Sequence, residues 1–67
     1  MLFTQRFNEV LKNSGVKQTD LAKFCNISKQ NITNFKAGKS FPSIETLYKI
    51  CQYLSCSADY LLGLSDI

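Results

Sequence analysis

Four polar side chains follow Ser28 at positions that share the leading end of one predicted helix. Lys29 and Gln30 begin the helix, and Thr33 and Asn34 lie one turn later. The carboxamides of Gln30 and Asn34 each carry a donor and an acceptor, which suits a bidentate contact with an adenine edge. Lys29 can donate to guanine, and the methyl group of Thr33 can contact thymine. These side chains have the chemistry to read base edges, although polar residues of this kind taken alone more often form a solvated face.

The helix that carries these residues is unusually poor in core material. Ser28 is a good N-cap, the helix continues to about Lys36, and Gly38 marks its end. Only Ile32 and Phe35 are large apolar residues within it. Because intrinsic propensity alone does not hold a helix of this length, its polar positions are interpreted as an exposed working surface.

Positive charge is concentrated in the middle of the chain. The net charge is +3, and residues 12–39 contain six lysines and a single acid, Asp20. A basic centre of this kind indicates a polyanionic partner. Charge alone does not identify that polyanion. If it is DNA, the expected phosphate contacts are Lys17, Gln18, Ser28, Asn31, Lys36 and Lys39. Lys12 and Lys23 are expected to face away, and each lysine has the alternative role of a solubilising charge.

Four further helical segments complete the pattern. They are expected at residues 3–14, at about residues 18–25, after Ser43 with apolar positions from 44 to 54, and at about residues 58–62. The segment after Ser43 is apolar over more than one face and is expected to be the central, most buried helix. The last four residues are expected to fray. With no period-2 run and 45% apolar residues, residues 1–67 are predicted to form one all-α domain.

Residues 15–43 closely resemble the lambda-repressor-like (Cro/CI-type, XRE-like) family of phage and bacterial regulators. The matching positions are Gln18-Thr19-Asp20-Leu21-Ala22 for the family's Gln-x-x-Leu-Ala, Ile27-Ser28 with Ile32, Gly38, Pro42-Ser43, and residues 43–47 and 57–63. The resemblance implies five helices, with the second and third forming a helix-turn-helix. It also implies that the third helix lies in the major groove of an operator, usually as part of a dimer, in a transcriptional repressor.

Four positions depart from the family pattern. Lys17 replaces the common Thr or Asn cap of the second helix, which weakens that cap. Leu11 and Lys36 stand where members often pair Arg with Glu, so the change leaves no unpaired buried charge. Ala37 replaces an Asn that is frequent in the family and that contacts the DNA backbone.

The C-terminal segment is the expected dimer surface. It is more apolar than a chain end requires, although packing against the first and fourth helices is an equal alternative for its residues. The predicted interface is Tyr60, Leu61, Leu64 and Ile67. Phe41, in the loop after the third helix, is the aromatic residue expected near DNA or at a dimer contact. The chain can also be the DNA-binding piece of a longer repressor.

Several classes of function are disfavoured. The sequence has no histidine, nucleophile elbow or phosphate-binding glycine motif, so no enzyme and no cofactor are expected. The three cysteines have no CxxC spacing and are interpreted as small apolar residues in a reducing cytoplasm. No signal peptide or membrane span is expected. The remaining alternatives are an antitoxin-type or other protein-binding module, a regulator with a protein antagonist, and a non-specific nucleoid binder.

Overall fold

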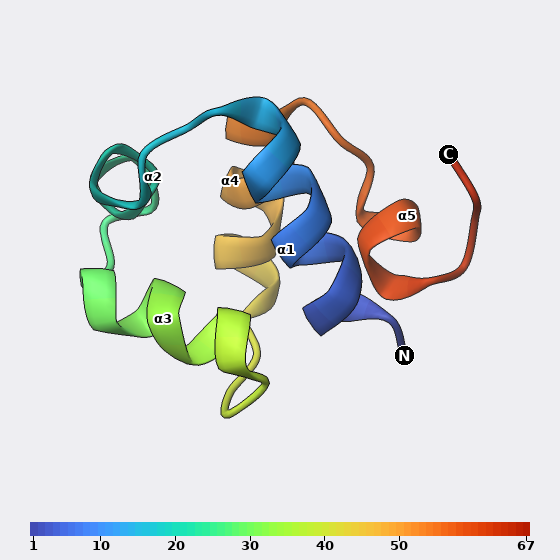
Figure 1. Cartoon of the computed structure of the whole chain (residues 1–67), viewed down its shortest axis with the longest axis horizontal. Helices are drawn as coiled ribbons and strands as arrows, with labels where there is room; N and C mark the ends of the chain where they lie inside the picture. The colour runs from blue at the N-terminus through green and yellow to red at the C-terminus, as the bar shows by residue number, and fades with distance from the viewer.

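The computed structural model describes all 67 residues and contains five α-helices and no strand. The helices are α1 (Phe3–Ser14), α2 (Gln18–Cys25), α3 (Lys29–Ala37), α4 (Ile44–Leu54) and α5 (Ala58–Leu62). In Figure 1, α1 lies in the middle of the molecule in front of α4, with α2 and α3 on one side and α5 on the other. The prediction of an all-α, five-helix fold is confirmed.

Local capping chemistry sets most of the helix boundaries. The side chains of Ser28, Ser43 and Ser57 accept hydrogen bonds from backbone N–H groups three residues later, at the starts of α3, α4 and α5. Asn26 and Ser55 adopt the left-handed conformation at the ends of α2 and α4. The start of α2 has no side-chain cap, as the lysine at its N-cap position predicts.

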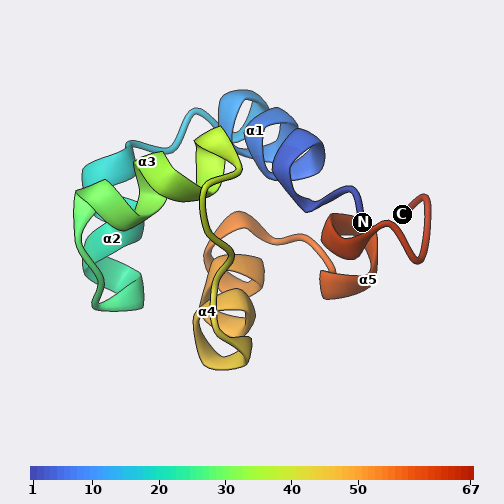
Figure 2. The ribbon, with the colours of Figure 1, turned by 90° about the horizontal axis from the view of Figure 1, so that it is seen from below.

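The core is a single cluster of eleven buried apolar residues. They are Phe3, Phe7, Leu11, Leu21, Ala22, Cys25, Ile32, Phe35, Ile50, Leu54 and Leu61. α1 and α2 supply three each and α4 only two, so the expectation that α4 is the most buried helix is wrong. The first turns of α4 extend away from the other helices (Figure 2), which leaves Ile44 88% exposed and Tyr48 62% exposed.

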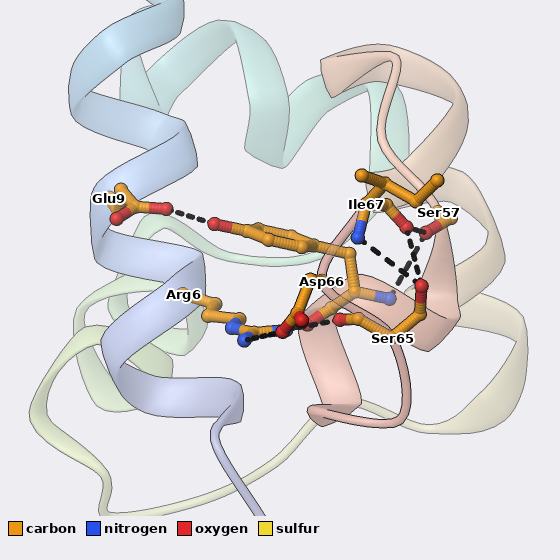
Figure 3. A network of polar contacts seen from close by, with 7 residues as sticks. Arg6, Glu9, Ser57, Ser65, Asp66 and Ile67 are labelled. Atoms are coloured by element: carbon orange, nitrogen blue, oxygen red, sulfur yellow. Dashed lines mark hydrogen bonds and ion pairs between the residues drawn. The ribbon is translucent and has the colours of Figure 1, made fainter.

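A polar clamp centred on Arg6 joins α1 to α5 and the C-terminal tail (Figure 3). Its guanidinium donates to the backbone carbonyls of Tyr60, at 2.8 Å, and Ser65. It also lies 3.5 Å from a carboxylate oxygen of Asp66 and 4.3 Å from the centroid of the Tyr60 ring. The Tyr60 hydroxyl in turn donates to Glu9 on α1. That hydrogen bond to a carboxylate raises the pKa of Tyr60 above its usual value.

Further hydrogen bonds hold the last residues of the chain. The carbonyl oxygen of Ile67 accepts from the hydroxyls of Ser57 and Ser65, at 3.0 and 3.2 Å. The Ile67 N–H also donates to the Ser65 hydroxyl. The bond to Ser57 holds the tail against the start of α5, and fraying of the last four residues stays a prediction.

The three cysteines are free thiols within or beside the core. Cys25 is buried, and Cys51 and Cys56 are half-buried. Burial raises the pKa of all three thiols. The pKa of Cys56 reaches about 11, because the charge and hydrogen bond of the neighbouring Cys51 raise it further. None of the five helices combines the length and apolarity that crossing a membrane requires.

Candidate nucleic-acid interface

α3 is anchored from behind by two apolar side chains and presents its other faces to solvent. Ile32 is 0% exposed and Phe35 is 6% exposed. The Phe35 ring packs edge-on against the rings of Phe3 and Phe7, with centroid distances of 6.4 and 6.2 Å. These contacts fix α3 against α1. The outer surface of α3 takes no part in the core.

The four predicted base-reading side chains lie together on that outer surface. Lys29, Gln30 and Thr33 are exposed, and Asn34 is half-exposed. The side-chain amide of Gln30 donates to the side-chain oxygen (Oδ1) of Asn34 at 3.1 Å. The Thr33 hydroxyl donates back to the carbonyl of Lys29 at 3.3 Å. The Gln30–Asn34 bond fixes the orientation of both amide groups, so each retains a defined donor or acceptor edge toward solvent.

The C-terminal end of α3 meets the N-terminal end of α2 and the last turns of α1. The Lys36 ammonium group lies 3.5 Å from the side-chain oxygen of Gln18. A hollow of about 540 Å³ opens between these elements, and its polar lining consists of Asn8, Lys12, Gln18 and Lys36. No acidic side chain lines it, so the hollow is positively charged and suits an anion. The expectation that Lys12 faces away from this surface is wrong.

Asn8 holds the end of α3 in place. Its side-chain amide donates to the carbonyl of Thr4 on its own helix at 2.8 Å and to the carbonyl of Lys36 at 2.9 Å. The second bond satisfies a carbonyl at the C-terminal end of α3 that has no partner within the helix. The sequence did not single out Asn8, although its i, i+4 spacing from Lys12 places the two on one face of the first helix.

The remaining predicted phosphate contacts are accessible to solvent. Lys17, Ser28, Asn31 and Lys39 are exposed, and Gln18 is half-exposed at the first position of α2. The Ser28 oxygen accepts the Asn31 N–H at 3.1 Å as the N-cap of α3, and its own hydroxyl hydrogen remains available to donate.

The predicted dimer residues do not form one exposed surface. Leu61 is 0% exposed and belongs to the core, so its assignment to an interface is wrong. Tyr60 is half-buried and engaged by Arg6 and Glu9. Leu64 and Ile67 are 76% and 92% exposed, and their role in a dimer stays a prediction.

Comparisons with known proteins agree with this geometry. The family model for the Cro/C1-type HTH DNA-binding domain matches residues 6–66. The HTH-type transcriptional regulator ImmR of Bacillus subtilis (strain 168) is 30% identical over 67 residues, which cover all of this chain and 53% of ImmR. The SPbeta prophage-derived uncharacterized HTH-type transcriptional regulator YonR of the same organism is 31% identical over 61 residues, covering 91% of this chain and 56% of YonR. No solved structure matches the chain significantly.

The chain spans about half the length of the curated relatives it matches. The family match, in contrast, begins at Arg6, in the first half of α1, and ends at Asp66, in the tail. It includes α2 to α5 completely and most of α1. It therefore covers the polar face of α3, the α2–α3 turn and the basic hollow in one continuous alignment. On this evidence the chain belongs to the Cro/C1-type helix-turn-helix DNA-binding family.

Proposed function

We propose that the chain is the DNA-binding domain of a sequence-specific transcriptional repressor of phage or bacterial origin. It acts in the cytoplasm as a homodimer and inserts α3 into the major groove of an operator. The observation that carries this proposal is the division of α3 into two sides. Ile32 and Phe35 are buried, while the polar residues around them are free to meet a partner.

Base readout is assigned to the leading half of α3. Residues at the N-terminal end of such a helix and one turn later reach base edges. Gln30 and Asn34 suit adenine, Lys29 suits guanine, and the methyl group of Thr33 suits thymine. A good bidentate contact contributes about 1–3 kcal/mol of discrimination against the wrong base.

Phosphate contacts are assigned to the surface around the start of α2. The exposed amides of this helix end and its dipole favour an anion beside Gln18. Lys17, Lys36 and Lys39 add charge, and Lys12 joins them because it lines the same hollow. With four to five phosphates neutralised by each protomer, a dimer is expected to show a log–log salt slope of about −7 to −9.

The test begins with selection of a duplex from random oligonucleotides at fixed salt. Gln30→Ala and Asn34→Ala should each weaken binding to the selected duplex by about tenfold and leave binding to random DNA nearly unchanged. Lys36→Ala should weaken both and flatten the salt slope by about 1. Asn13→Ala is the matched control, because Asn13 is exposed at the end of α1 beside a different hollow.

Two outcomes would contradict the proposal. Equal losses on selected and random DNA for the Gln30 and Asn34 variants would indicate a non-specific binder. Failure of the wild-type chain to bind any duplex at low salt would instead favour the protein-recognition alternative, an antitoxin-type module on the same fold.

A further inference from the structure

Two of the three cysteines meet at the turn that ends α4. Cys51 lies in the last turn of α4, and Cys56 is the second residue after the end of the helix at Leu54. Ser55, just before Cys56, adopts the left-handed conformation, and the Cys56 N–H donates to the carbonyl of Cys51 at 3.1 Å. A helix that ends in this way frequently brings the side chains at these two positions into contact. Here both side chains are thiols.

The geometry of this pair suits a covalent bond. A backbone hydrogen bond of this length keeps the two Cα atoms within about 7 Å of each other, and cysteines joined by a disulfide have Cα atoms about 4.4–6.8 Å apart. The two thiols also form a hydrogen bond with each other. It partly offsets the effect of burial on the pKa of Cys51 and adds to that effect on the pKa of Cys56. The Cys56 S–H is therefore the donor of this bond, and the Cys51 sulfur is the acceptor.

Solvent reaches the pair. Cys51 and Cys56 are both half-buried, whereas Cys25 is only 4% exposed. Cys56 also lines a hollow of about 400 Å³ between the end of α4 and the last turns of α1. The only charged side chain that lines this hollow is Glu9, whose carboxylate accepts from the Tyr60 hydroxyl. A small thiol reagent can therefore approach Cys56 in the folded chain.

We propose that Cys51 and Cys56 are a dithiol site that a low-molecular-weight disulfide oxidises reversibly to an intrachain disulfide. The Cys51 thiolate attacks one sulfur of the small disulfide, which forms a mixed disulfide and releases one small thiol. The Cys56 thiolate then attacks the Cys51 sulfur and releases the second small thiol. The two cysteines lose two electrons and two protons in all, and the small disulfide takes up both to become two thiols. Because the two thiols already touch, ring closure needs little movement of the backbone.

The new bond would tie the end of α4 to the start of α5. Cys56 directly precedes Ser57, the N-cap of α5, and α5 carries the core residue Leu61. Figure 1 shows the connection from α4 to α5 on the side of the molecule away from α3. Oxidation therefore stabilises the packing of α5 and leaves the α3 surface unchanged, so this inference does not rest on the proposed function. In a reducing compartment the pair stays as thiols, and disulfides that do form there are mostly transient or redox-sensing.

The test brings the reduced full chain to equilibrium with graded ratios of reduced to oxidised glutathione. Mass spectrometry after acid quenching counts the hydrogen atoms lost and any glutathione attached. Trypsin then locates the bond, because cleavage after Lys49 leaves Cys51 and Cys56 together on residues 50–67, without Cys25. The same titration in concentrated urea gives the corresponding ratio for the unfolded chain.

We expect the native chain to lose two hydrogen atoms within residues 50–67. The equilibrium constant for this oxidation should exceed that of the unfolded chain by about tenfold or more, because the fold holds the two sulfurs together. Oxidation should raise the Tm by roughly 5–15 °C. Cys25→Ala is the matched control and should form the same bond. Cys51→Ser should form no intrachain bond and should carry glutathione on Cys56 instead.

Several results would overturn the proposal. They are equal equilibrium constants for the native and unfolded chains, separate glutathione adducts on Cys51 and Cys56 of the native chain, a disulfide that involves Cys25 or a second chain, and a lower Tm after oxidation. If Cys25→Ala does not fold, the wild-type chain alone decides the question, because the tryptic fragment of residues 50–67 already separates the pair from Cys25.

Discussion

Replacing Arg6 by alanine should remove the largest single polar contribution to the stability of this domain. The Arg6 side chain is 18% exposed and reaches from α1 to the carbonyls of Tyr60 and Ser65. No other side chain joins α1 to both α5 and the tail. Truncation would remove the side-chain donor of the Ser65 carbonyl, leave the Tyr60 carbonyl with only the Gly63 N–H, and take the cation from the face of the Tyr60 ring.

The magnitude follows from the two hydrogen bonds. A hydrogen bond to a charged group contributes about 1.5–3 kcal/mol, and partial exposure places these at the lower end, so the pair contributes about 3 kcal/mol. A domain of this length has a total stability of roughly 3–10 kcal/mol. Each kcal/mol shifts the Tm of such a domain by about 4–8 °C, so Arg6→Ala should melt roughly 10–25 °C below wild type.

Thermal and urea unfolding followed by circular dichroism would measure this difference. Arg6→Lys is the matched variant, because it retains the charge but lacks the planar fork of donors, and we expect an intermediate loss. Asp66→Asn should have a small effect, because the Asp66 side chain is fully exposed. A Tm for Arg6→Ala within about 2 °C of wild type would refute the reasoning, since the clamp would then contribute almost nothing.

Three other perturbations test separate parts of the fold. Ser28→Ala removes the cap of α3 and should cost about 1 kcal/mol, read as a fall in Tm of about 4–8 °C; an unchanged Tm would show that the cap is dispensable. Gly63→Ala should destabilise more than Gly15→Ala: both residues have positive φ, but a Cβ at Gly63 would lie 3.1 Å from Leu2, whereas one at Gly15 meets nothing within 4 Å. The raised pKa of Cys56 stabilises the folded chain fully below about pH 9, and this contribution is lost as pH rises toward about 11, because the unfolded thiol ionises first. Urea midpoints in a reducing buffer should therefore fall less steeply over that range for Cys56→Ser than for wild type, and parallel curves would contradict the assignment.

Short-range signals in the sequence predicted the helices well. Ser28 caps the helix that it was expected to cap, and the helix expected after Ser43 begins at the next residue, Ile44. These features depend on a side chain and a backbone group only a few residues apart, so residue type and spacing are sufficient to identify them.

Long-range contacts were not predictable in the same way. The bond from Asn8 to the carbonyl of Lys36 spans 28 positions, and the bond from Arg6 to Ser65 spans 59. Neither pair has a periodic or motif signal, because the contact exists only once the helices are packed. The exposure of Ile44 has the same origin: its apolar character predicted burial, and only the packing shows that the start of α4 extends beyond its neighbours.

If α3 reads an operator as we propose, the hydrogen bond between Gln30 and Asn34 affects how the base pairs are read. Because one amide orients the other, a substitution at either position changes the hydrogen-bonding edge that both present. Under this proposal, preferences at two neighbouring base pairs would be interdependent, and a description that scores each operator position separately would misjudge some sequences. A double-mutant cycle across Gln30 and Asn34, repeated on each base-pair combination, would measure this interdependence as a non-additive free energy.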